Sequence, residues 1–221
     1  MRRVLILRPE PGATATLLRA HKCGLDPIAV PLFEVEPLPW EAPEAGGFDG
    51  LLLTSANAVR GSGEELKKLR GLPVYAVGEA TEEAARGAGF SIAATGDGDV
   101  ERLLGSLEPG LRLLHLCGED RKGPSDSRQQ ITAVTVYRAK PVEAPDLHGV
   151  EGAVALIHSP RAGRRFAELV LERRAVAIAA ISPAAAAAVG EGWQSVEAAA
   201  EPNDDALLAL AARLCNKPPP E

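Results

Sequence analysis

The chain has 221 residues, a net charge of −6 and 46% hydrophobic residues, of which few are aromatic. This length allows one large domain or two of ordinary size, and the apolar content suffices for cores built from small aliphatic side chains. The negative charge leaves no broad basic face for a phosphate backbone, so we do not expect nucleic acid as a partner.

The sequence suggests neither a secretion signal nor a membrane span. The N-terminus is basic and then briefly apolar, but Arg8, Pro9 and Glu10 end the apolar run, which predicts a first strand. Ser182 and Pro183 interrupt the longest apolar stretch before it reaches membrane-spanning length. We therefore expect a protein that does not interact with membranes.

The three cysteines are Cys23, Cys117 and Cys215. They are far apart and odd in number, which fits neither a metal-binding pattern nor a disulfide framework. We expect each to be a buried structural thiol in a reducing compartment, and the protein to be cytoplasmic.

Short apolar runs alternate with amphipathic or alanine-rich runs along the whole chain. The runs predicted as strands are, in order, 2–8, 26–35, 49–55, 73–78, 90–96, 111–118, 131–139, 153–159, 175–182 and 195–200. The clearest predicted helices are 62–69, 81–88, 99–107, 162–172, 184–190 and 204–214. This alternation predicts an α/β fold with parallel sheets covered by helices on both faces.

Four landmarks recur at a spacing of 104 residues. The pairs are Ser55 and Ser159, Gly78 and Ser182, Phe33 and Tyr137, and Pro37 and Pro141. Although few residues are identical between the halves, this shared register predicts two copies of one α/β unit.

The repeat is compatible with two divisions of the chain. A cut at mid-chain would give two sequential domains. The alternative places crossings at 34–39 and 138–145, so that 38–140 is an inserted domain and 1–35 plus 145–221 form a discontinuous one. We favour the second, because the runs DGLLLTS and AVALIHS follow the two crossings in the same way. Each domain would hold a parallel five-stranded sheet flanked by helices, and a two-stranded linker would form the hinge of a ligand cleft.

Ligands of open parallel sheets bind at the carboxyl ends of strands, near helix N-termini. The corresponding turns here are LTSANAV, AVGEAT, HSPRAG and ISPAAA, with Arg8 at the end of the first strand. Ser55, Ser159 and Ser182 stand where N-caps are needed, and capping alone is the simpler interpretation of any one of them. The recurrence of the turns in both copies favours a site for anions such as carboxylates.

Common cofactor fingerprints are missing from the sequence. It has no GxGxxG, P-loop, GxSxG or HExxH motif, so we expect no cofactor and no metal. His115 and His158 are expected to be packed and hydrogen-bonded. Tyr137 is either an amphipathic residue at the core edge or a proton donor, since a phenol with a pKa of about 10 is protonated at neutral pH.

An ordered series of motifs resembles the uroporphyrinogen-III synthase family over nearly the whole chain. The series is LRP, LLLTSANAV, VYAVGEATEEAARGAGF, LCGEDR, VYRA, HSPRAG and PNDDAL. The resemblance implies two similar α/β domains with a two-stranded linker, no cofactor, and a monomer. The implied substrate is hydroxymethylbilane, a linear tetrapyrrole bearing acetate and propionate groups. An upstream deaminase supplies it, and functional coupling to this deaminase is a further expectation.

The implied reaction, a step of haem biosynthesis, is dehydration with ring closure. Loss of the hydroxymethyl OH gives an azafulvene, the substituted position of the terminal ring attacks it, and a spiro intermediate then reopens and closes with ring D inverted. The substrate closes spontaneously to the uninverted isomer, so the main task of the protein would be positioning.

The resemblance also implies roles for individual residues. Those implied in substrate binding are Thr54, Ser55, Ala56, Asn57, Gly78, Thr81 and Ser159, with Ser55, Ala56 and Thr81 offering N–H or hydroxyl donors. Tyr137 matches the tyrosine proposed as proton donor. The chain departs from the family at SPAAAAA, where Ser182 would replace an expected hydroxyl residue, and at Arg161, which stands where a small residue is common and could pair with a propionate.

Two other interpretations remain open. A non-catalytic module of the same fold could bind an anionic metabolite through the same turns, and the fold alone cannot separate it from the enzyme. A sugar- or nucleotide-binding two-domain protein is less consistent with the missing phosphate loops and scarce aromatic residues.

Overall fold

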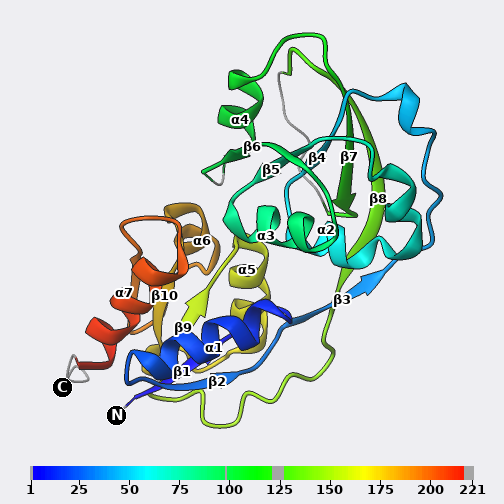
Figure 1. Cartoon of the computed structure of the whole chain (residues 1–221). Coiled ribbons are helices and arrows are strands. Elements are labelled where there is room, and N and C mark those ends of the chain that lie inside the picture. The colour runs from blue at the N-terminus through cyan, green and yellow to red at the C-terminus, as the bar shows by residue number, and fades with distance from the viewer. Residues whose placement is uncertain (1, 98, 121–126, 217–221) are drawn as a thin grey trace. The chain divides into compact units, whose positions relative to one another are not determined.

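The computed structural model describes residues 2–97, 99–120 and 127–216. The end of the LCGEDR motif and most of the C-terminal tail lie outside the described residues. The chain forms two compact units, a first unit of Met1–Glu34 with Pro141–Glu221 and a second unit of Val35–Lys140 (Figure 1). No helix among the described residues is long and apolar enough to cross a membrane.

The first unit contains a parallel sheet in the order β11-β10-β9-β1-β2. Its strands are β1 (Arg3–Ile6), β2 (Asp26–Ala29), β9 (Val154–Ile157), β10 (Ala177–Ala180) and β11 (Ser195–Ala198). All residues of β9 and β10 are buried, which explains why these strands are apolar throughout and do not alternate with polar residues.

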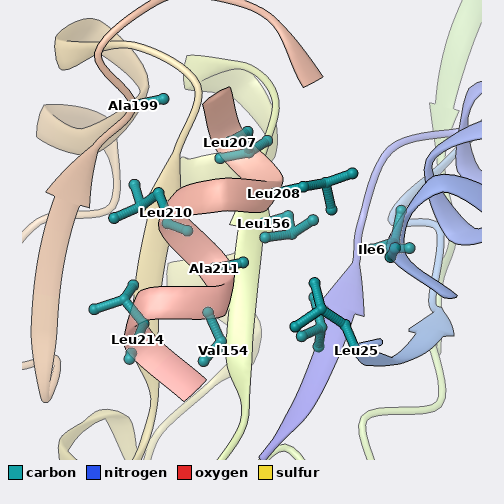
Figure 2. Close-up of a cluster of buried hydrophobic side chains, with 14 of the residues drawn as sticks. Ile6, Leu25, Val154, Leu156, Ala199, Leu207, Leu208, Leu210, Ala211 and Leu214 are labelled. Carbon is teal, nitrogen blue, oxygen red and sulfur yellow. The ribbon is translucent and has the colours of Figure 1, made fainter. Parts of the chain in front are cut away.

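Helices cover both faces of this sheet. α1 (Gly12–Lys22) and α7 (Asp204–Asn216) pack on one face, and Figure 2 shows the leucines of α7 beside Val154 and Leu156 of β9. α5 (Pro160–Leu169) and α6 (Pro183–Ala188) lie against β9 and β10 on the other face, with the short 3₁₀ helix η3 (Arg173–Ala175) after α5.

The second unit contains a six-stranded sheet in the order β3-β8-β7-β4-β5-β6. Its strands are β3 (Phe33–Pro37), β4 (Gly50–Leu53), β5 (Val74–Val77), β6 (Ile92–Gly96), β7 (Arg112–Gly118) and β8 (Gln130–Pro141). This sheet has six strands where five were expected, because the linker strand β3 pairs with β8 and extends the sheet. Pairing satisfies backbone groups that an extended linker would otherwise leave to water.

Helices also lie on both faces of the second sheet. α2 (Ala56–Gly61), α3 (Glu79–Gly87) and η2 (Gly63–Leu69) pack with Leu51 and Leu53, whereas α4 (Val100–Ser106) packs with Leu52 on the opposite face (Figure 1). A further 3₁₀ turn is η1 (Ala45–Gly47). The helix predicted at 62–69 is thus a 3₁₀ helix that follows the short α2.

The 104-residue spacing recurs at the beginnings of helices. Ser55 and Ser159 are the N-caps of α2 and α5, and Gly78 and Ser182 are those of α3 and α6. A third pair adds to the repeat: Asp99 caps α4, and the side chain of Asn203 accepts the Ala206 N–H at the start of α7 at 2.9 Å. In strand order, β6-β5-β4-β7-β8 of the second unit corresponds to β11-β10-β9-β1-β2 of the first.

The expectation that all three cysteines are buried is wrong for one of them. Cys117 is buried and Cys215 is partly buried, but Cys23 is exposed. Cys23 follows the last turn of α1, whose buried residues are Ala13, Thr16 and Ala20, and so it lies beyond the packed face of that helix.

Candidate functional site

The turn after β4 carries four of the predicted site residues, Thr54 to Asn57. Ser55 has an extended backbone, and its Oγ accepts the N–H of Asn57 at 3.2 Å. The Ser55 carbonyl accepts the N–H of Ala58. Since the first N–H groups of a helix have no intrahelical partner, Ala56 offers the first-turn N–H that Ser55 does not use.

The hydroxyl of Thr54 lies against a buried histidine. Thr54 Oγ1 and His115 Nε2 are 3.1 Å apart, and His115 is only 2% exposed in β7, the neighbour of β4. The expectation of a packed, hydrogen-bonded histidine is confirmed for His115. The contact restricts the Thr54 hydroxyl at the carboxyl end of β4.

The turn after β5 depends on glycine. Gly78 has φ of +87°, a region that favours glycine, and its carbonyl accepts the N–H groups of Thr81 and Glu82 at 3.1 Å each. Thr81 is 4% exposed. Because the Thr81 N–H donates to the Gly78 carbonyl, only the Thr81 hydroxyl remains as the expected donor to a ligand.

Tyr137 lies at the carboxyl end of β7 because the register of β8 shifts there. Cys117 pairs with Thr135 but Gly118 pairs with Tyr137, so that Val136 is an extra residue. As a result, Val136 and Tyr137 pack against the same cluster, which strict alternation along a strand would not allow.

Two glycines make room for the Tyr137 ring. A Cβ on Gly118 would lie 2.7 Å from the ring Cζ and 3.0 Å from the hydroxyl, and one on Gly61 would lie 3.0 Å from the tyrosine Cβ. The phenol therefore contacts the backbone at the end of β7 directly, in a half-buried position suited to a proton donor or a packed edge residue.

In the first unit, Ser159 and Ser182 cap α5 and α6. Their Oγ atoms accept the N–H groups of Ala162 at 3.2 Å and Ala185 at 3.3 Å, and proline follows each serine at the start of the helix. The capping interpretation is thus confirmed for all three predicted serines. A capping hydroxyl keeps its own proton, so capping is compatible with donation to a carboxylate.

Arg161, in the first turn of α5, lies over the ring of Phe33. Its Cζ is 4.4 Å from the ring centroid, and Phe33 is 6% exposed. A guanidinium stacked on an aromatic face is held in place by this contact.

Arg8 takes part in an ionic cluster around Asp204. Its Nη1 donates to Thr16 Oγ1 at 3.3 Å and to Asp204 at 3.1 Å, and Thr16 donates to Asp204 Oδ2 at 2.6 Å. Arg19 Nη1 lies 3.8 Å from the same carboxylate, whose side chain is 10% exposed. Two arginines therefore surround a single carboxylate.

His158, the residue after β9, completes this cluster. Its Nε2 lies 3.3 Å from Asp204 Oδ1, and the ring also interacts with the backbone of Leu156. The buried ring and these polar contacts agree with the expectation of a packed, hydrogen-bonded histidine.

The cluster shifts the pKa of both titratable groups. Burial lowers the pKa of His158 more than Asp204 raises it, so the ring is neutral at pH 7. Burial alone would raise the pKa of Asp204, but the approach of His158, the hydrogen bond from Thr16 and the charge of Arg8 hold it well below its ordinary value. The cluster therefore keeps an excess of positive charge from the two arginines.

The predicted residues gather at the carboxyl edge of each sheet. The second unit holds Thr54, Ser55, Ala56, Asn57, Gly78, Thr81 and Tyr137, on the neighbouring strands β5, β4, β7 and β8 or the turns after them. The first unit holds Arg8, Ser159, Arg161 and Ser182, after β1, β9 and β10. In the described part of the chain, no group of three or more His, Cys, Asp or Glu side chains is arranged to hold a metal ion.

The sequence did not identify Thr16 or Asp204 as neighbours of Arg8. Thr16 lies within α1, and Asp204 in the PNDDAL stretch resembles an ordinary acidic residue at a helix start. The hydrogen bonds join residues 188 and 196 positions apart, so no local pattern could indicate them.

Comparisons with known proteins agree with this architecture. A family model described as uroporphyrinogen-III synthase HemD matches residues 13–209. The solved uroporphyrinogen-III synthetase of Helicobacter pylori is 20% identical with a TM-score of 0.67, covering 97% of this chain and 100% of its own. A mutant uroporphyrinogen III synthase of Thermus thermophilus is 18% identical with a TM-score of 0.55, covering 99% and 100%. The comparison with curated proteins found no significant match.

Proposed function

This chain belongs to the uroporphyrinogen-III synthase HemD family, a family of tetrapyrrole cyclases, and we propose that it is a cyclising hydro-lyase acting on hydroxymethylbilane. The product would be uroporphyrinogen III, formed with loss of water and inversion of ring D. The observation that carries this proposal is the family match over residues 13–209, nearly the whole chain.

The strand-end turns are suited to an anionic tetrapyrrole. In the second unit, the N–H of Ala56 and the hydroxyls of Ser55 and Thr81 would bind acetate and propionate groups. In the first unit, Ser159 and Ser182 would do the same, with Arg8 and Arg161 supplying charge. Such preorganised donors stabilise carboxylates without a large net charge on the protein.

Tyr137 would act as the general acid. Its phenol would protonate the departing hydroxyl of the substrate, so that water leaves and the azafulvene forms. The space left by Gly61 beside the tyrosine Cβ and by Gly118 beside the ring supports this role, because it lets the phenol lie at the end of β7. The remaining steps need the chain to hold the terminal ring so that its substituted carbon attacks.

The two units provide the basis for a domain proposal. We propose that residues 35–140 form an inserted domain and that the remaining chain forms a discontinuous one, with β3 and β8 carrying the two crossings.

Because the substrate closes spontaneously to the wrong isomer, transfer from the deaminase that supplies it would favour the correct product.

The test supplies hydroxymethylbilane generated in place by the deaminase and separates the oxidised uroporphyrin isomers by chromatography. The proposal predicts mainly the type III isomer with the native protein and only type I with the heat-inactivated protein. Type I alone, from protein shown to be folded, would reject the activity and favour a non-catalytic module that binds anionic ligands.

A further inference from the structure

Resting on the proposed function, we propose that Asp204 is a positioning residue that, together with Thr16, holds the guanidinium of Arg8 as a preformed binding group for a substrate carboxylate. Asp204 lies in the first turn of α7, and Arg8 follows β1. The fold therefore brings the N-terminal and C-terminal segments of the first unit together at the carboxyl edge of its sheet.

The contacts hold one end of the arginine and leave part of it exposed. Among the described residues, the hydrogen bonds of Arg8 to Asp204 and Thr16 all involve Nη1. The Arg8 side chain remains 35% exposed, against 10% for Asp204. An arginine fixed in this way loses less side-chain freedom when it binds a carboxylate.

Gly12 leaves room for the other side of the guanidinium. A Cβ at this position would lie 2.6 Å from Arg8 Nε and 2.9 Å from its Cζ, so a larger residue here would displace the arginine side chain. Thr16 lies one turn further along the same helix, where it hydrogen-bonds both Arg8 and Asp204.

The charges of the cluster favour an anion. Asp204 contributes one negative charge, Arg8 and Arg19 contribute two positive charges, and His158 is neutral at pH 7. The remaining positive charge lies at the carboxyl edge of the first sheet. At this edge β9, which pairs with β1, is followed by Ser159 and the N-terminus of α5. A carboxylate at this edge would meet both the cation and the helix N-terminus.

The test is a double-mutant cycle on the steady-state formation of the type III isomer. We expect Asp204→Asn and Arg8→Gln each to raise the KM for hydroxymethylbilane about tenfold with kcat changed less than twofold, since both remove ground-state binding. The double variant should be no worse than Arg8→Gln alone, because Asp204 acts through Arg8. Asp205→Asn, the exposed neighbour on α7, is the matched control and should leave KM unchanged.

Several results would overturn the inference. An unchanged KM in Asp204→Asn, or effects that multiply in the double variant, would assign Asp204 a structural role only. If Asp204→Asn does not fold, Thr16→Val takes its place, because it removes the 2.6 Å hydrogen bond while keeping every charge, and an unchanged KM there rejects the inference. Absence of the type III isomer from the wild type would reject both proposals, whereas failure of this inference alone leaves the wild type active.

Discussion

At the scale of single residues, small side chains decide where the reactive ones lie. Gly61 and Gly118 contact Tyr137, and Gly12 contacts Arg8. In each case a Cβ would meet the neighbour at 3.0 Å or less. The glycines thus permit close approach of a phenol or guanidinium to the backbone. The sequence alone does not show which glycines have this role.

Tyr137→Phe should lower kcat for type III formation by about 100-fold, because general acids typically contribute at least this factor. The fold should be unaffected, since the ring is kept. Tyr75→Phe, which changes the only other tyrosine of the chain, is the matched control and should retain activity. Both variants are assayed by isomer chromatography, with circular dichroism as a check of folding. Unchanged turnover in Tyr137→Phe would remove the phenol from the mechanism.

Asp204 should make the stability of the protein depend on acid pH. Its folded pKa lies below its unfolded value, so its contribution is fully present above about pH 4 and is lost as pH falls through the folded pKa. Asp204→Asn should therefore cost about 2 kcal/mol of unfolding free energy at pH 7, and less at pH 3.

Urea titrations at pH 7, 5 and 3 measure this difference. Asp205→Asn should stay within about 0.5 kcal/mol of the wild type at each pH, because it is an exposed substitution. An Asp204→Asn deficit that stayed constant from pH 7 to pH 3 would contradict the assignment of the low pKa to this carboxylate.

At the scale of elements, helix starts combine a structural role with the proposed binding role. Ser55, Ser159 and Ser182 all accept a backbone N–H from their own helix. Aspartate can provide the same cap, but its charge would repel a carboxylate ligand. The two roles can therefore be separated by substitution.

Ser55→Asp should keep the stability of the wild type within about 0.5 kcal/mol while raising the KM for hydroxymethylbilane about tenfold. Asp99→Ala, which removes the N-cap of α4 outside the proposed site, should do the reverse and cost about 1 kcal/mol with KM unchanged. Thermal unfolding and isomer assays distinguish these effects. A normal KM in Ser55→Asp would leave Ser55 with a capping role only.

Most elements could be predicted from local patterns. Each of the ten apolar runs contains a strand, and the strands β4, β9 and β10 are fully buried, as expected for runs that are apolar throughout. The run 26–35 divides into β2 and β3 around Pro31. Helix α1 was not among the clearest predictions, since it lacks acidic residues in its first turn and its cap, Pro11, offers no side-chain hydrogen bond. It forms because Ala13, Ala20 and Leu17 pack into the core of the first unit.

At the scale of the whole molecule, the two units share one strand order with different chain connections. In the second unit the chain passes from β4 to β8 in sequence, whereas in the first unit the strands equivalent to β7 and β8 are β1 and β2, at the other end of the chain. The second unit is thus a continuous segment with its own hydrophobic clusters.

A fragment of residues 33–141, which keeps β3 and β8 complete, should fold on its own. We expect dispersed amide signals in its NMR spectrum and one cooperative urea transition, because its core is built within the fragment. The control is a fragment of residues 50–118, which lacks β3 and β8 and should unfold without cooperativity. A non-cooperative transition in the longer fragment would contradict the domain proposal.

The sequence by itself determined the α/β class, the strands, the 104-residue spacing and the family, because each depends on residues that are close in the chain or on their order along it. Only the tertiary structure decided the surroundings of the reactive groups. The shift in register beside Gly118 directs Tyr137. Packing of α7 on the first sheet brings Asp204 to Arg8, and pairing of β4 with β7 brings His115 to Thr54. These contacts join residues that are far apart in the chain. They depend on strand register and on packing, which no local pattern in a single sequence indicates.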